Sequence, residues 1–323
     1  MPYKFHAAGR HHIPKAKYRV RNWPAYNAGL CRRGSITLWL SPDVTDGWKA
    51  PKREGRGGEA LYSDGAIEAM LTLGAVYHLR LRQTQGFTKS VFDLLGLDLP
   101  VASAATLCRR RKALSIKPWT QEPSKPLDLV LDSTGLKIFG QGEWCRAKHG
   151  RKPRGWKKVH IGLDAKSGII VSHLMTDKDA GDPDQVDALL AQIDGPVGRF
   201  MADGAYDGDP VYDAVKRHSP DPVPKVVIPP RRTAVLSSEI EEEQTDRDRN
   251  ILDLKAKGRM AWQKVHDYGR RSLVETMMGR YKSIIGDRLH ARHGDAQPVE
   301  LAIGIKALNR MTNLAKPISV KVG

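Results

Sequence analysis

Cysteine is scarce in this sequence, and long apolar runs are missing. The 323 residues include three cysteines, at positions 31, 108 and 145, with no CxxC pair among them. Such widely separated cysteines form neither a disulfide framework nor a zinc site, and they fit a reducing compartment. Residues 1–15 lack the apolar segment of a secretory signal, and no apolar run approaches about 20 residues. We therefore expect a cytosolic protein.

Acidic residues are also in deficit. The chain has 53 Lys and Arg residues against 36 Asp and Glu, a net charge of +17, and its pI is near 9.8. About 12 of these net charges lie in residues 1–125. A surplus of this size predicts a polyanionic partner, most simply double-stranded DNA, whose binding weakens as salt rises. An acidic membrane surface is the competing interpretation.

The N-terminal part has the pattern of a small helical domain. Residues 1–22 form a basic segment without hydrophobic periodicity, expected to be a flexible arm. Residues 23–125 follow, with a short helix near 22–34, an extended run at 36–40, a Gly-rich linker at 49–60, and helices over 63–82, 86–96 and 103–114. Three short helices suit a helix-turn-helix-like DNA-binding domain, and a plain helical bundle is the alternative. The basic residues expected on DNA are Arg32, Arg33, Arg109, Arg110, Arg111 and Lys112.

Residues 126–316 change to an α/β pattern, and 317–323 form a C-terminal tail. The pattern predicts a strand at 128–140, a hairpin at 157–177, a helix at 182–193, strands at 198–208 and 225–232, then helices, the last an amphipathic one at 298–316. This order predicts a mixed sheet flanked by helices. The basic loop after the first strand, between Trp144 and Trp156, adds Lys148 and Arg151 as candidate DNA contacts, and Lys157 and Lys158 follow directly after Trp156.

Two aspartates interrupt otherwise apolar strands. Asp132 lies in LVLDSTG and Asp203 in FMADGAY. An ionised aspartate is rarely buried unpaired, although either residue alone is equally well explained as a cap for the next turn. Together with Glu275, on a helix able to pack over the same sheet, they supply three oxygen ligands of the kind that Mg²⁺ binds. Two such ions support in-line displacement at a phosphodiester.

The helix that carries Glu275 has two different faces. Tyr268, Arg271, Glu275 and Lys282 fall within about 60° of arc, because a helix turns about 100° per residue. The opposite side, with Leu273, Met277 and Ile284, is expected to be buried. A solvated salt-bridged face is the alternative explanation. With the two aspartates in place, Arg271 and Lys282 become candidates for holding DNA phosphates, and Tyr268 for stacking on or hydrogen bonding to DNA.

The order DSTG, DGAY and Y-x2-R-x3-E-x6-K resembles the catalytic core of DDE transposases of the insertion-sequence-five family. Further similarity in LDSTGLKIFGQGEW, IPPR, DRDRN and KALNRMT points to the subgroup whose elements flank the kanamycin-resistance transposon. The resemblance implies a ribonuclease-H-like catalytic domain in which Asp132, Asp203 and Glu275 are catalytic and bind Mg²⁺, with Mn²⁺ as a substitute. It also implies binding to terminal inverted repeats, cleavage at the element ends and strand transfer into target DNA.

The same resemblance implies a homodimer or larger synaptic assembly and a bacterial, nucleoid-associated location. Two alternatives remain at this point: a transposase-derived DNA-binding regulator that no longer cuts, and a ribonuclease-H-type nuclease. Two other groups of residues are interpreted as structural. His160, in a core strand, is expected to be a structural histidine, and the aspartates at 177, 179, 182 and 184 are expected to form a solvated turn and helix cap.

Overall fold

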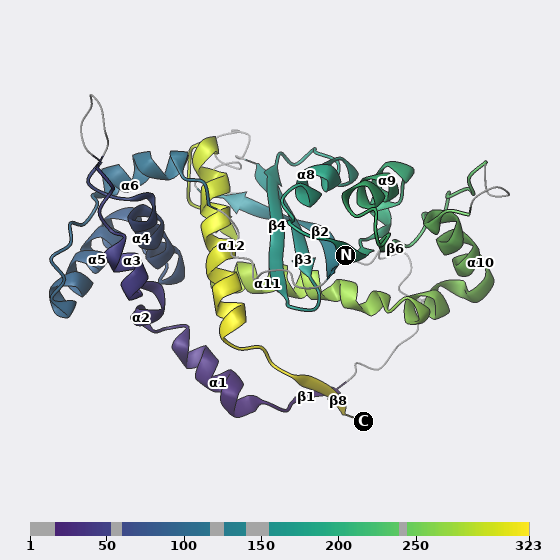
Figure 1. Cartoon of the computed structure of the whole chain (residues 1–323), viewed down its shortest axis with the longest axis horizontal. Coiled ribbons are helices and arrows are strands. Elements are labelled where there is room, and N and C mark those ends of the chain that lie inside the picture. Colours follow the sequence, from purple (N-terminus) through teal and green to yellow (C-terminus); the bar gives the residue numbers. More distant parts are fainter. Residues whose placement is uncertain (1–16, 53–59, 117–125, 140–154, 239–243, 323) are drawn as a thin grey trace, which may run out of the picture.

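The computed structural model describes residues 17–52, 60–116, 126–139, 155–238 and 244–322. A group of short helices from the N-terminal third lies at one end, and a sheet with helices on both sides forms the rest (Figure 1). The long helix α12 stands between these two parts. Within the described residues, no helix has both the length and the apolar character needed to cross a bilayer.

The N-terminal helices pack around a core that contains Trp39, Trp48 and Phe92. The expectation of one helix over 63–82 is wrong. One helix ends at Val76 and another begins at Leu81, because His78 between them adopts a left-handed φ of 55°. The extended run expected at 36–40 is also wrong, since this segment is the short helix α2. The elements are α1 Trp23–Arg32, α2 Ile36–Trp39, α3 Pro42–Asp46, α4 Asp64–Val76, α5 Leu81–Leu95, α6 Ala104–Arg110 and the 3-10 helix η2 Arg111–Ala113.

The sheet has the strand order β4-β3-β2-β5-β6, and β7 pairs with the end of β2. Strand β3 is antiparallel to both of its neighbours, β2 and β4, whereas β5 and β6 run parallel to β2. This is the ribonuclease-H-like arrangement, so the predicted α/β class with a mixed sheet is confirmed. The strands are β2 Leu127–Ile138, β3 Trp156–Asp164, β4 Ile169–Thr176, β5 Val197–Met201, β6 Lys225–Val227 and β7 Arg288–Leu289.

Helices cover both faces of this sheet (Figure 1). Side chains alternate along β2, so Leu129 and Leu131 belong to one core and Val130 and Leu136 to the other. The first core is closed by α8 Val186–Leu190 and α9 Asp209–His218, and the second by α11 Ser272–Ile284 and α12 Gln297–Leu314. A further helix, α10 Asp246–Val265, leads from the end of the sheet to α11.

Helix α12 is buried on two sides, which corrects the expectation of an amphipathic helix. Val299, Ile303, Ala307 and Met311 face the N-terminal core, whereas Leu301, Ile305 and Leu308 face the sheet. A helix that is apolar all round belongs in the interior. The predicted division between domains at residues 125 and 126 stays a prediction, and α12 contributes to the cores on both sides of it.

The basic segment at the start of the chain is partly ordered. Residues Lys17–Val20 form β1, which pairs antiparallel with β8, Ser319–Val322, from the C-terminal tail. Asn22 adds two hydrogen bonds to this end of the chain, donating to the Lys316 carbonyl and accepting from the Ile318 amide. The expectation of a flexible arm over 1–22 is therefore wrong for its last residues, while residues 1–16 lie outside the described part.

Candidate active site

The register of two parallel strands brings Asp132 and Asp203 together. Val130 of β2 pairs with Met201 of β5, and each aspartate comes two residues later along its own strand direction. Side chains alternate with a period of two, so both carboxylates point to the face on which Val130 and Met201 pack. Asp203 follows the last residue of β5 and accepts a hydrogen bond from the Ala205 amide at 2.8 Å.

Glu275 reaches this face from α11. The segment is not one uniform helix: Tyr268–Arg271 is the 3-10 helix η5, and α11 begins at Ser272. The residues of α11 that pack on the sheet are Val274, Met277, Met278 and Tyr281. Leu273, expected to be buried, is 39 % exposed. Met277 is buried as expected, but the buried face is rotated toward Val274 and Tyr281, because these side chains and not Leu273 pack on the sheet.

Arg271 links two of the three carboxylates. Its guanidinium donates to Asp132 Oδ2 at 3.2 Å and also to Glu275 Oε1. Burial raises the pKa of Asp132; Arg271 and the Ser133 amide lower it, and the charges of Asp203 and Glu275 raise it again. The net direction is upward. The three acids therefore repel one another in one electrostatic cluster, and Arg271 offsets part of this repulsion.

Two further residues of the predicted site brace the same face. Lys282 Nζ donates to Thr134 Oγ1 at 2.6 Å, which fastens α11 to β2 two residues beyond Asp132. The Tyr268 hydroxyl donates to the Ala202 carbonyl at 3.1 Å, next to Asp203, and its ring packs on Trp262. Burial is the main reason that the pKa of Tyr268 rises to about 12, so this hydroxyl stays protonated.

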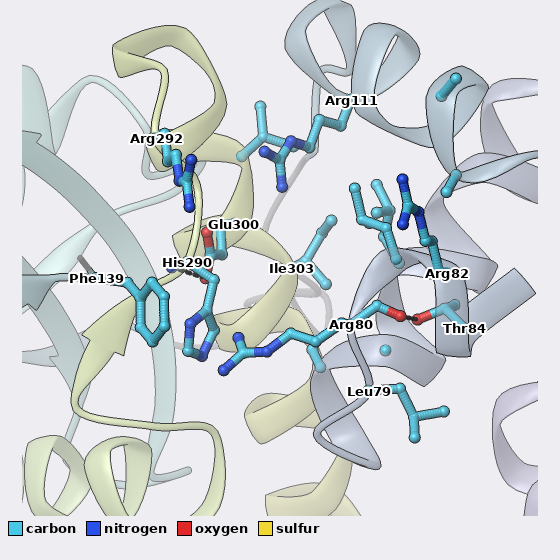
Figure 2. A pocket seen from close by; sticks show the side chains of 17 residues that line it. Leu79, Arg80, Arg82, Thr84, Arg111, Phe139, His290, Arg292, Glu300 and Ile303 are labelled. Carbon is cyan, nitrogen blue, oxygen red and sulfur yellow. Dashed lines mark hydrogen bonds between the residues drawn. The ribbon is translucent and has the colours of Figure 1, made fainter.

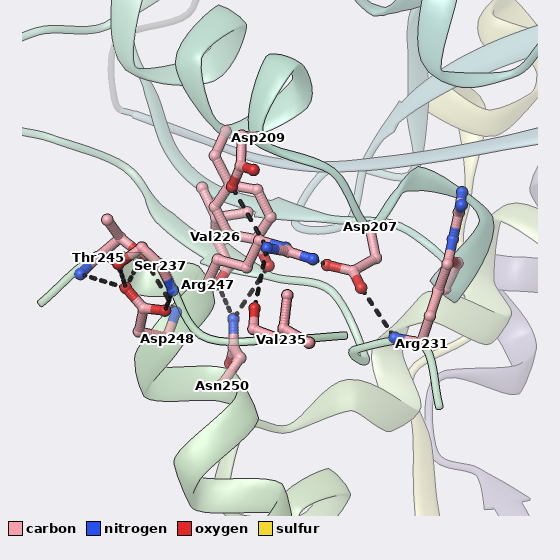
Figure 3. A network of polar contacts seen from close by, with 12 residues as sticks. Asp207, Asp209, Val226, Arg231, Val235, Ser237, Thr245, Arg247, Asp248 and Asn250 are labelled. Atoms are coloured by element: carbon pink, nitrogen blue, oxygen red, sulfur yellow. Dashed lines mark hydrogen bonds and ion pairs between the residues drawn. The ribbon is translucent and has the colours of Figure 1, made fainter. Parts of the chain in front are cut away.

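A polar network behind Asp203 holds its turn (Figure 3). Arg231 donates from Nε to the Gly204 carbonyl at 3.0 Å and from Nη2 to the Ala205 carbonyl at 2.5 Å. Asp207, whose side chain is fully buried, accepts from the Arg231 amide at 2.8 Å and from Arg247 Nε at 3.0 Å. No spacing along the chain indicated a role for these three residues, although Arg231 and Arg247 lie in the motifs IPPR and DRDRN.

On the other face of the sheet, Asp182 pairs with buried His160, which corrects its interpretation as a solvated turn. His160 Nδ1 lies 3.2 Å from Asp182 Oδ1, and Lys158 Nζ lies 3.0 Å from the same oxygen. Burial would raise the pKa of Asp182, but hydrogen bonds from His160, Lys158 and Ser133 lower it to about 2. His160 is fully buried, and its Nε2 lies 2.9 Å from Thr176 Oγ1.

The predicted DNA contacts are spread over several surfaces. Arg32, Arg109 and Lys112 are exposed. Arg110 donates to Asp64 at 2.6 Å, and Arg33 donates to the Ala315 carbonyl at 3.3 Å. Trp156, 44 % exposed, lies against Gly135 of β2, where a Cβ atom would come within 2.9 Å of its ring. Three further residues of the basic loop, Trp144, Lys148 and Arg151, lie outside the described part, and Lys157 pairs with Asp177 at 2.5 Å.

The chemistry of these donors suits a divalent metal ion. Asp132, Asp203 and Glu275 offer carboxylate oxygens, the ligands that Mg²⁺ prefers, and the electrostatic cluster that they form calls for a cation. In the described part of the chain, however, no group of three His, Cys, Asp or Glu side chains is arranged to hold an ion. We attribute this to Arg271, whose guanidinium donates to two of these carboxylates.

The chain therefore has a ribonuclease-H-like sheet with two acids at the ends of adjacent strands and a third on a covering helix. A model described as "Transposase DDE domain" matches residues 123–310, and a second with the same description matches residues 31–141. Because the first match spans more than half of the chain, the protein belongs to the DDE transposase family, whose members use divalent metal ions.

Among solved structures, the chain is similar to a piggyBac transposase in a cryo-EM synaptic complex with hairpin DNA. The sequences are 11 % identical, and the TM-score is 0.43. The match covers 87 % of this chain and 73 % of the other.

Proposed function

We propose that this transposase binds the terminal inverted repeats of an insertion sequence, cuts DNA at the element ends with Mg²⁺, and transfers the cut strands into target DNA. The observation that supports this best is the register of β2 and β5, which sets Asp132 and Asp203 side by side under the helix of Glu275. We assign the element to the insertion-sequence-five family, in the subgroup that flanks the kanamycin-resistance transposon.

The metal site in this proposal consists of Asp132, Asp203 and Glu275. Bound Mg²⁺ ions, or Mn²⁺ in their place, would supply Lewis acidity and a water or hydroxyl that is easier to deprotonate. The chain's own residues then position the DNA. Arg271 exchanges its carboxylate partners for a phosphate of the bound strand. Lys282, which hydrogen-bonds to Thr134 two residues beyond Asp132, contacts the next phosphate. Tyr268 acts by holding Ala202, next to Asp203.

The remaining contacts with DNA would come from the N-terminal domain and the basic loop. Exposed Arg32, Arg109 and Lys112 can grip phosphates without reading sequence. The net charge of +17 supports tight, salt-dependent binding. Two element ends must be processed together, so we propose a homodimer or a larger synaptic assembly.

The experiment uses purified protein, a labelled duplex that carries the inverted repeat flanking the gene, and Mg²⁺. We expect nicking at the element end and joined products with a target plasmid, and no product with EDTA. Glu275→Gln should lower the rate by about 10³-fold or more while binding to the duplex is kept, since it removes a metal ligand but no grip on DNA.

The matched control is Asp213→Asn, which also replaces a carboxylate by its amide. Asp213 is exposed on α9, a helix that packs on the opposite face of the sheet from Glu275. This variant should cut and join DNA as the wild type does. Equal activity of Glu275→Gln and wild type would falsify the proposal.

A further inference from the structure

A cavity of about 700 Å³ lies between the N-terminal helices and the α/β part (Figure 2). Its walls come from α4, α5 and α6, from α12, and from the residues that follow β2 and β7. A volume of this size is within the range of small-ligand sites, which are clefts of about 300–1,000 Å³. No part of the active site lines it, so its function has to be read from its own side chains.

The lining carries strong positive charge. Arg80, Arg82, Arg111 and Arg292 line the cavity together with a single carboxylate, Glu300. Figure 2 shows Arg111 and Arg292 entering from opposite sides, both directed toward the space above Glu300. Arg111 Nε is buried and has no hydrogen-bond partner among the described residues. A buried guanidinium nitrogen without an acceptor is costly, and an anionic oxygen would satisfy it.

Glu300 offsets only part of this charge, and its own hydrogen bonds go to the backbone rather than to an arginine. Its two oxygens accept from the amides of His290 at 2.8 Å and Ala291 at 2.7 Å. Burial raises the pKa of Glu300, while these amides, Arg111 and Arg80 lower it, and the net direction is upward. The arginines therefore outnumber the acid four to one, and the cavity favours an anion.

The rest of the lining suits a flat aromatic group. The guanidinium of Arg80 lies over the ring of Phe139 at 5.1 Å, and the His290 ring meets the same ring edge-on at 5.4 Å. Leu79 and Ile303 supply apolar surface nearby. Guanidinium planes and aromatic rings are the groups on which proteins stack unpaired bases. One cavity thus combines a phosphate-binding group with a base-stacking group, which is the chemistry of a nucleotide.

The cavity is also aligned with the active site. Phe139 follows β2 and continues its ladder, since its amide donates to the Leu289 carbonyl at 2.8 Å. It comes seven residues after Asp132, which corresponds to roughly 23 Å at about 3.3 Å per strand residue. A DNA strand advances about 3.4 Å per phosphate, so the same distance corresponds to about seven nucleotides.

We propose that this arginine pocket receives one unpaired nucleotide of a bound DNA strand, about seven nucleotides from the bond at Asp132. The phosphate contacts Arg111 and Arg292, and the base stacks against the Arg80–Phe139 pair. The inference rests on the proposed function in one respect, that the chain binds DNA. Free mononucleotides share this chemistry, so the test has to separate the two sources.

The test measures binding of full-length protein in EDTA, where cleavage cannot occur, to an inverted-repeat duplex with a single unpaired 2-aminopurine. The unpaired position is moved along the strand, and a fully paired duplex is the reference. We expect wild type to bind the best unpaired duplex about tenfold more tightly than the paired one, with a change in 2-aminopurine fluorescence. Arg111→Gln and Phe139→Leu should each remove this preference, and Phe139→Leu should keep affinity for the paired duplex within about threefold, because it removes no charge.

Arg217→Gln is the matched charge control, because Arg217 is exposed on α9 and pairs with Asp187 at 2.8 Å. Arg217→Gln should keep the wild-type preference for the unpaired duplex. Equal affinity of wild type for paired and unpaired duplexes would overturn the inference while leaving the proposed function intact, whereas loss of binding to both would count against the proposed function itself. Binding of free dAMP that depends on Arg111, without any preference for the unpaired duplex, would overturn the assignment to a DNA strand.

Discussion

Arg271 and Asp132 form an ion pair at 3.2 Å in the middle of the candidate metal site. The same guanidinium holds Glu275, so one arginine takes up charge on two of the three carboxylates. Both groups of the central pair are largely shielded from solvent, with 20 % and 15 % of their side chains exposed. In the proposed metal site, this arginine would have to give up its carboxylate partners to a bound cation.

The competition between Arg271 and a metal ion for these carboxylates can be measured without DNA. Replacing Arg271 by Gln removes a positive charge from the carboxylates, so Mn²⁺, used as a probe, should bind about tenfold more tightly. The measurement is titration of the free ion by electron paramagnetic resonance. Arg271→Lys keeps the charge and should remain close to wild type. Unchanged affinity in Arg271→Gln would show that the guanidinium does not compete with the metal.

The polar network behind Asp203 predicts that two neighbouring aspartates differ in their contribution to stability. Asp207 is buried and pairs with Arg247 at 3.0 Å, whereas Asp209 is 73 % exposed and lies 3.5 Å from the same arginine. Asp207→Asn should lower the free energy of unfolding by about 2–4 kcal/mol, because it leaves the shielded Arg247 guanidinium without its buried anion. Asp209→Asn should change it by less than about 0.5 kcal/mol. Urea unfolding of both variants provides the comparison. An equal loss of unfolding free energy in the two variants would contradict this role of Asp207.

Helix α12 predicts a second local effect on stability. The Asn309 side chain accepts from the Ile170 amide at 2.9 Å and donates to the Ile170 carbonyl at 2.8 Å, along the outer edge of β4. Asn309→Ala should cost about 1–3 kcal/mol, since both backbone groups lose a buried partner. Asn313→Ala, one turn further along the same helix and exposed, is the control. Thermal unfolding should separate the two variants; similar melting temperatures would argue against this edge contact.

His173 predicts a dependence of stability on pH. Burial lowers its pKa from 6.5 to about 4, and its Nδ1 has no hydrogen-bond partner among the described residues. The unfolded chain then binds a proton that the folded chain does not, so the contribution to stability is complete above about pH 6.5 and falls as pH drops toward 4. His173→Gln should flatten the pH dependence of unfolding between these values. Parallel curves for variant and wild type would refute this assignment.

Strand and helix types followed closely from sequence, because apolar periodicity depends on local order along the chain. The sheet strands, the hairpin and the α/β class agree with their patterns. One error arose where a local conformation broke the pattern: the left-handed His78 ended α4 early, although no Gly or Pro stands beside it. Another concerned α11, whose buried face lies at Val274 and Tyr281 rather than at Leu273, because packing on the sheet decides which side of the helix is covered.

The candidate site was predicted in its chemistry but not in its supports. Asp132 and Asp203 stood out because each interrupts an apolar strand, and Glu275 because it lies between basic residues on one helix face; their roles as metal ligands stay a prediction. Arg231 hydrogen-bonds to the turn after Asp203, and Asp182 pairs with His160. Both contacts join residues far apart in the chain. Spacing along one element carries no information about such contacts.

By itself, the sequence determined the charge of the protein, the kinds of element and the residue types available for chemistry, since these depend on composition and on neighbours within a few residues. Tertiary structure decided which carboxylates share a face, which arginines pair with acids and which line a cavity. Those outcomes depend on the packing of α11 and α12 and on strand register, in which a shift of one residue moves every side chain to the other face of the sheet.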